Sequence, residues 1–176
     1  MSAAQIHLAL NHFPIAGIIL SFPILLWGLI AKKEQIKIVG IAMIFVASLS
    51  AFAVMQTGDG AEEIVEHKPL VTKNLIHEHD EAAEKAMAAI QACAVLSIAW
   101  IVLNKKNHAF QDKVLYAILV VNLAGAGLVA NAAHLGGMIR HDELRSGQAA
   151  TANVQVEKAE HEENEKKENN EANEKK

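Results

Sequence analysis

The chain has 176 residues, of which 52% are hydrophobic and 20% charged, and its formal net charge is −4. This length fits one domain, and the single cysteine, Cys93, excludes an internal disulfide and a four-cysteine metal site. No hydrolase, nucleotide-binding or nucleophile motif occurs in the sequence. We therefore expect neither an independent enzyme nor a nucleic-acid partner.

Four apolar runs divide the chain into spans and loops. A helix needs about 20 residues to cross ~30 Å of hydrocarbon, and each run is close to that length or longer. The runs are Phe13–Ala31, Ile36–Gln56, Ala86–Leu103 and Val114–Ile139. We predict an all-α fold, an integral membrane four-helix bundle within a transmembrane domain of residues 1–145. The predicted helices cover about residues 8–31, 36–57, 79–104 and 113–141.

The first run does not resemble a signal peptide, because no basic residue precedes it and no small-residue cleavage site follows it. Pro14 is tolerated near a helix start, where the first amides have no partners. His12 then lies in the first turn, near the membrane surface, and we expect its ring to point into the bundle. His7 lies about 140° around the same helix and fits a solvated position equally well.

Lysines in the short loops predict the orientation, because cytoplasmic loops carry an excess of Lys and Arg. The long loop from Gly58 to Lys85 holds eight acidic residues against three lysines. The two short loops carry Lys32, Lys33, Lys37, Lys105, Lys106 and Lys113. We therefore expect a multi-pass protein of the bacterial inner membrane, with both termini and the long loop in the periplasm.

The third predicted helix begins near His79, whose ring we expect to face inward along a stripe of small residues. That stripe consists of Ala82, Ala83 and Ala86. The acidic residues beside this stripe, Asp80, Glu81 and Glu84, have two possible interpretations. Carboxylates could accept a hydrogen bond from a metal-bound imidazole, or they could simply complement the positive end of the helix dipole. His67 and His77 read as loop residues.

The fourth predicted helix carries His134 and His141, which share one face at a separation of about 10 Å. Axial haem ligands approach iron from opposite sides, so these two cannot both serve one haem. Gly136 and Gly137 follow His134 and leave space for a flat macrocycle or for a close neighbouring helix. Packing of helices around a hydrogen-bonded His134 remains the alternative interpretation.

Seven of the nine histidines fall at the same end of the predicted bundle. Imidazole is costly to keep in hydrocarbon and is the commonest metal ligand in proteins. This clustering predicts haem b or, alternatively, a copper, zinc or iron ion. The candidate ligands are His12, His79, His134 and His141, with Gly136 and Gly137 beside the cofactor.

The C-terminal tail of residues 146–176 is charged, and its last part has almost no apolar residue. The segment from Val156 to Lys176 contains eight glutamates and five lysines. Such a segment cannot bury enough surface to offset the ordering of the chain, so we expect it to be disordered or a solvated helix.

Four short motifs resemble a family of uncharacterised four-span bacterial membrane proteins, known only as a domain of unknown function. The motifs are "HLALNHFPIAG", Thr57-Gly58, His79 before the third span and "HLGG" in the fourth. The resemblance covers about residues 5–145. In that family the residue after the first histidine is often proline, whereas here it is Leu8. The resemblance implies a four-span fold and a haem-type or redox role, without an established activity.

Three functions remain open at this point. The first is a b-type cytochrome-like protein or subunit in the lipid bilayer, which transfers electrons between the quinone pool and a periplasmic carrier. It could also belong to a larger membrane redox complex. The second is a membrane metal sensor or permease subunit for copper, zinc or iron. The third is a cofactor-free assembly subunit whose charged tail binds a partner.

Overall fold

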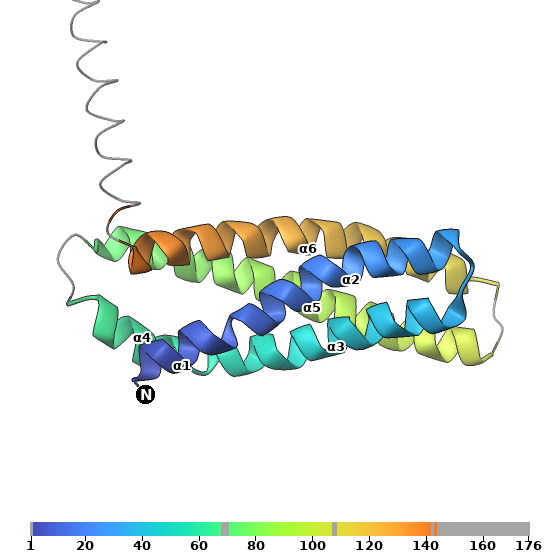
Figure 1. Ribbon diagram of the computed structural model, residues 1–176, viewed down its shortest axis with the longest axis horizontal. Coiled ribbons are helices and arrows are strands. Elements are labelled where there is room, and N and C mark those ends of the chain that lie inside the picture. Colours follow the sequence, from blue (N-terminus) through green and yellow to red (C-terminus); the bar gives the residue numbers. More distant parts are fainter. Residues whose placement is uncertain (1, 68–70, 107–108, 142, 144–176) are drawn as a thin grey trace, which may run out of the picture. The chain divides into compact units, whose positions relative to one another are not determined.

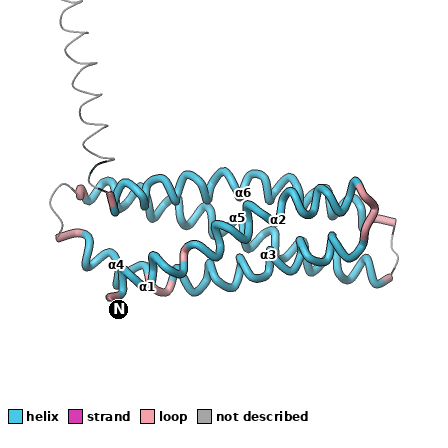
Figure 2. The backbone as a smooth tube through the Cα atoms, viewed as in Figure 1, coloured by secondary structure: helices cyan, strands magenta, loops and turns pink. Residues whose placement is uncertain are grey.

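The computed structural model describes residues 2–67, 71–106, 109–141 and 143, so the predicted tail of residues 146–176 lies outside the described part. The described residues form helices and no strand, as Figure 2 shows. The helices are α1 (Ala3–Leu10), α2 (His12–Ile30), α3 (Glu34–Met55), α4 (Gly58–Val65), α5 (Lys73–Lys105) and α6 (Gln111–Arg140). The chain has two compact units, Met1–Ile139 and Arg140–Lys176, and the bundle belongs to the first.

Within the described residues, four helical stretches are long and apolar enough to cross a membrane, with α1 and α2 counted as one stretch. The predicted all-α fold with four membrane-length helices is therefore confirmed for the described residues. The 33 residues of α5 extend about 50 Å, well beyond the ~30 Å of a hydrocarbon layer. The surplus corresponds to the charged segment from Lys73 to Lys85, which precedes the apolar part of α5.

Two helix starts differ from the predicted ranges, and local capping explains both. Ser2 caps α1, because its hydroxyl accepts from the amide of Gln5 while the Gln5 side chain accepts from the Ser2 amide. The Thr72 hydroxyl accepts from the Leu75 amide, so α5 begins six residues before the predicted position 79. The short helix α4 was not predicted.

Asn11 separates α1 from α2, and Pro14 explains the interruption. Proline has no amide hydrogen and its ring crowds the carbonyl four residues before it, which here belongs to Leu10. The backbone at Asn11 nevertheless keeps a helical conformation, with φ −63° and ψ −20°. The two helices therefore continue in nearly the same direction, as the blue ribbon in Figure 1 shows.

The closest helix pair is α2 with α3, and glycines make this approach possible. A Cβ atom added at Gly17 would lie 2.8 Å from Cβ of Ala47. One added at Gly28 would lie 2.8 Å from the backbone nitrogen of Lys37. Small residues at such contacts let two backbones approach closely, which is typical of membrane helix pairs.

Polar contacts link two further pairs of helices, α2 with α6 and α3 with α5. The Asn122 amide on α6 donates to Ser21 Oγ on α2 at 2.7 Å, and both side chains are fully buried. Ser48 Oγ on α3 donates to Gln91 Oε1 on α5 at 2.6 Å. These bonds fix helix register where few other polar groups occur.

The surface of the bundle is apolar along most of its length. Ile30, Leu49 and Val120 are each at least 70% exposed, while Ile18, Cys93 and Trp100 are buried in the interior. A water-soluble protein rarely exposes so much contiguous apolar area. The surface is therefore suited to hydrocarbon surroundings.

Candidate functional site

At the end of the bundle where the N-terminus lies, α1 packs against α4 and carries the half-buried His7. The Nδ1 atom of His7 lies 3.0 Å from Thr57 Oγ1. The Thr57 hydroxyl donates its only proton to the carbonyl of Val54 at 2.7 Å. The His7 ring must therefore donate from Nδ1, which leaves the lone pair of the neutral ring on Nε2.

His79 on α5 is the second half-buried imidazole at this end. Its Nδ1 donates to the carbonyl oxygen of Ala132 on α6 at 3.0 Å, because a carbonyl can only accept. His79 thus has the same tautomer as His7, with the lone pair on Nε2. The buried neighbours Ala82 and Ala86 continue its face along α5, where the sequence places an inward stripe.

Gly136 accommodates the His79 ring. A Cβ atom added at Gly136 would lie 3.0 Å from Cε1 of His79. The space that the sequence assigned to a macrocycle at this glycine is therefore filled by the imidazole itself. The second interpretation of this glycine, close packing against a neighbouring helix, describes the structure better.

One carboxylate, Asp80, interacts electrostatically with the two imidazoles. Charges on His7, His79 and Asp80 act on one another, which places the three groups within electrostatic reach. Asp59 on α4 and Glu84 on α5 also act on Asp80. Burial is the largest influence on both groups: it lowers the pKa of His7 and raises the pKa of the Asp80 carboxyl, while the Asp80 charge opposes the shift of His7.

His12 does not take part in this site. Its side chain is exposed on α2, and its Nδ1 donates to the Leu8 carbonyl of the preceding turn at 2.8 Å. The expectation that the ring points into the bundle is wrong. Position 12 lies off the buried face of α2, which passes through Pro14 and Gly17.

His134 also lies away from the interior. Its side chain is exposed on α6, while the neighbouring Ala132 is buried. Gly127, one heptad earlier, shares this outward face and has no atom near its missing side chain. Gly137 is half-buried. The predicted convergence of His12, His79 and His134 is therefore wrong, because only His79 faces inward.

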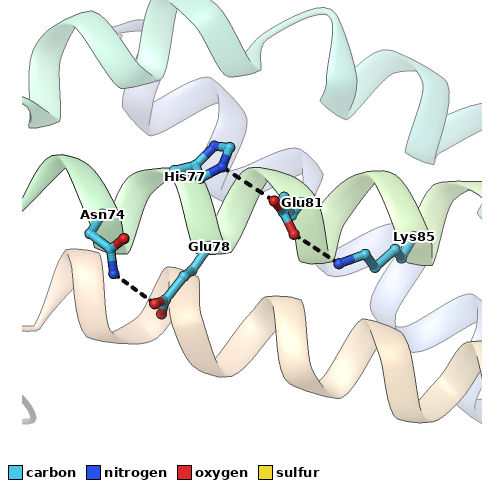
Figure 3. Close-up of polar contacts among 5 residues, drawn as sticks. All are labelled: Asn74, His77, Glu78, Glu81 and Lys85. Carbon is cyan, nitrogen blue, oxygen red and sulfur yellow. Dashed lines mark hydrogen bonds and ion pairs between the residues drawn. The ribbon is translucent and has the colours of Figure 1, made fainter.

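The other histidines in the described part lie on the surface. His141 belongs to the second unit, where its Nδ1 lies 2.9 Å from Glu143 Oε1. Backbone and His141 hydrogen bonds hold the pKa of the Glu143 carboxyl below its ordinary value. His77 pairs with Glu81 at 3.2 Å on an exposed face of α5, in a series of polar contacts that Figure 3 shows. His67 is 77% exposed.

The sequence did not predict the contact between His7 and Thr57. One sequence pattern could have predicted that His7 faces inward, because inward positions of α1 and α2 recur every seven residues. His7, Pro14, Ser21 and Gly28 form this series. The Thr57 contact crosses 50 residues of sequence, and no local pattern predicts it.

Among the described residues, no three His, Cys, Asp or Glu side chains already lie together as a metal site. Comparisons with protein-family models, curated proteins and solved structures give no match to this chain. The family resemblance of the motifs thus stays a prediction, and the function has to be argued from the two imidazoles.

Proposed function

We propose that this chain is a b-type cytochrome-like protein of the bacterial inner membrane, with His7 and His79 as the haem-ligating pair. The supporting observation is that each ring is anchored through Nδ1 by an oxygen from another helix or loop, which leaves Nε2 available. Metal-bound histidines have this arrangement, because the anchored nitrogen fixes both tautomer and ring orientation. In this proposal His7 replaces His12 and His134 as the partner of His79.

The two imidazoles would suit a haem that is held by two histidines. His7 and His79 come from α1 and α5, and ligands from separate helices are common in four-helix bundles. A bound haem would supply one-electron transfer. The protein would orient the His7 ring through Thr57 and the His79 ring through the Ala132 carbonyl. Partial burial of both rings would limit the access of water.

The membrane assignment of this proposal is supported by the four long apolar helices and the exposed apolar surface. The lysines of the two short loops favour a cytoplasmic position for the opposite end. His7 and His79 would then lie at the periplasmic face, within reach of a periplasmic electron carrier or the rest of a redox complex.

A metal ion without porphyrin is the second candidate, and the nearby carboxylates favour it. Asp80, Asp59 and Glu84 would attract a divalent cation, whereas the two propionates of a haem would be repelled. Imidazole suits copper, zinc and iron equally well. In this case the chain would be a metal sensor or a permease subunit.

The absorbance spectrum of the purified full-length protein, expressed with adequate haem, tests the proposal. We expect a Soret band that shifts on reduction. Elemental analysis of the same sample distinguishes the candidates, since stoichiometric metal without porphyrin would favour the ion site. A sample with neither haem nor metal would contradict both and favour a cofactor-free assembly subunit.

A further inference from the structure

Three polar atoms inside the bundle, near the end that carries the two short loops, have no hydrogen-bond partner in the described part of the chain. They are Ser97 Oγ and Trp100 Nε1 on α5 and Gln111 Oε1 on α6. The Ser97 side chain is fully buried, and Trp100 is 2% exposed. An unpaired polar group is costly in an apolar interior, so buried polar groups bond either to the protein or to ordered water.

The hydroxyl of Ser97 differs from other serine hydroxyls on the helices. Ser21 donates to the carbonyl of Ile18, and Ser50 donates to the carbonyl of Val46. A bond to the preceding turn is a common way for a helical serine to pair its hydroxyl. Ser97 makes no such bond within the described residues, so its Oγ is available to a ligand in the interior.

The three unpaired atoms come from neighbouring positions of the fold. Ser97 and Trp100 are three residues apart on α5 and therefore adjoin each other on one helix face. The helices α5 and α6 run in opposite directions, and the bond between His79 and Ala132 sets their register. In this register Gln111, the first residue of α6, lies level with Trp100 to within about one helical turn.

The chemistry of the three groups identifies the ligand. The indole N–H of Trp100 can only donate, the amide oxygen of Gln111 can only accept, and the Ser97 hydroxyl can do both. The indole N–H would repel a cation, the amide oxygen would repel an anion, and no fully buried side chain in the described part carries a charge that could neutralise an ion. Water donates and accepts, and a buried water molecule makes about three hydrogen bonds.

We infer that an ordered water molecule is bound between Ser97, Trp100 and Gln111 inside the bundle. It accepts from Trp100 Nε1, donates to Gln111 Oε1 and bonds to Ser97 Oγ, and it thereby connects α5 to the start of α6. The half-buried position of Gln111 at the helix start provides the route by which water enters. The site lies at the opposite end of the bundle from His7 and His79, goes beyond the proposed function and does not require a cofactor.

Nuclear magnetic resonance of the full-length protein in deuterated detergent, with ¹⁵N-labelled tryptophan, tests the inference. The chain has two tryptophans, so Trp27→Phe assigns the indole signal of Trp100. We expect a through-space cross peak between water and the indole proton of Trp100, although this side chain is only 2% exposed. A rotating-frame measurement distinguishes such a contact from chemical exchange by the sign of the peak.

Two variants of the same shape test the role of the hydroxyl. Ser97→Val removes it and should reduce the cross peak to no more than about half, because the water loses one of its three hydrogen bonds. Ser97→Thr adds similar bulk, keeps the hydroxyl and should retain the peak. Ser50→Val is the control on another helix, since the Ser50 hydroxyl is already bonded to its own backbone, and should leave the peak unchanged.

Two results would overturn the inference. The first is absence of a water cross peak at Trp100 in the unmodified protein, which requires no variant to fold. The second is a peak of full intensity both in Ser97→Val and in Gln111→Leu, which removes the acceptor at a half-buried position. Circular dichroism checks that the variants keep the helicity of the unmodified protein. Neither result depends on whether the protein holds haem or a metal ion.

Discussion

The middle of the bundle and its histidine-bearing end differ in the side chains that the buried helix faces carry. In the middle, these faces carry small or apolar side chains, and few polar bonds such as Asn122–Ser21 connect the helices. At the end, the same faces carry His7 and His79. The two half-buried imidazoles therefore lie where the buried faces of α2 and α5 continue past the apolar runs.

A second difference separates the inward from the outward histidines. His7 and His79 are held by oxygens of other segments, whereas His12 bonds only to the preceding turn of its own stretch and His134 is exposed. Contacts between segments orient a side chain relative to the whole bundle. A contact within one helix does not.

The largest effect is expected from Gly28→Val at the contact between the end of α2 and the start of α3, away from the histidine-bearing end. The added side chain would meet the backbone of Lys37, so α2 and α3 must separate, at a cost of about 3 kcal/mol. Unfolding in detergent, followed by circular dichroism, measures this change. Gly127→Val is the matched control, because nothing lies near that glycine. Equal stability of the two variants would contradict the assigned packing.

The next effect concerns Thr57→Val at the histidine-bearing end. The variant keeps the shape of the side chain but removes the oxygen that orients His7. Loss of such a partner lowers cofactor affinity about 10- to 100-fold. Titration of the apoprotein with haem, or with the metal found by elemental analysis, checks this value. Thr57→Ser should retain affinity, and a loss there as large as in the valine variant would argue against an orienting hydroxyl.

A smaller effect is expected from Asn122→Leu. The variant loses the bond to Ser21, but it also removes Oδ1, which has no hydrogen-bond partner within the described part of the chain. Interhelical hydrogen bonds in membrane proteins contribute about 0.6 kcal/mol on average, so we expect a loss of roughly that size. Unfolding in detergent measures it. A loss above about 2 kcal/mol would show that the bond does more than fix register.

The smallest effect is expected from His77→Ala. His77 is two residues from His79, but its ring is exposed and its partner Glu81 already pairs with Lys85. Exposed ion pairs contribute little, so stability should change by less than about 0.5 kcal/mol. Cofactor content should stay unchanged. Loss of the cofactor in this variant would place the site on the wrong face of α5.

The sequence was sufficient for the spans but not for the orientation of every histidine. Apolar runs of membrane length predict the four long helices, because hydrophobicity along one segment is a local property. The inward direction of His79 follows from its alanine stripe. The inward direction predicted for His12 was wrong because that prediction relied on its position at the helix start before Pro14. It did not consider the seven-residue series through His7. The contact of His7 with Thr57 depends on how α1 meets the start of α4, which tertiary packing decides.

Two double variants of the same size test most directly whether His7 and His79 hold the cofactor. His7→Ala with His79→Ala removes the two inward rings, and His12→Ala with His134→Ala removes the two outward rings. Haem content by absorbance, and metal content by elemental analysis, are measured on both and on the unmodified protein. We predict that the inward pair loses the cofactor and the outward pair retains it. Retention by the inward pair, or loss in the outward pair alone, would contradict the site.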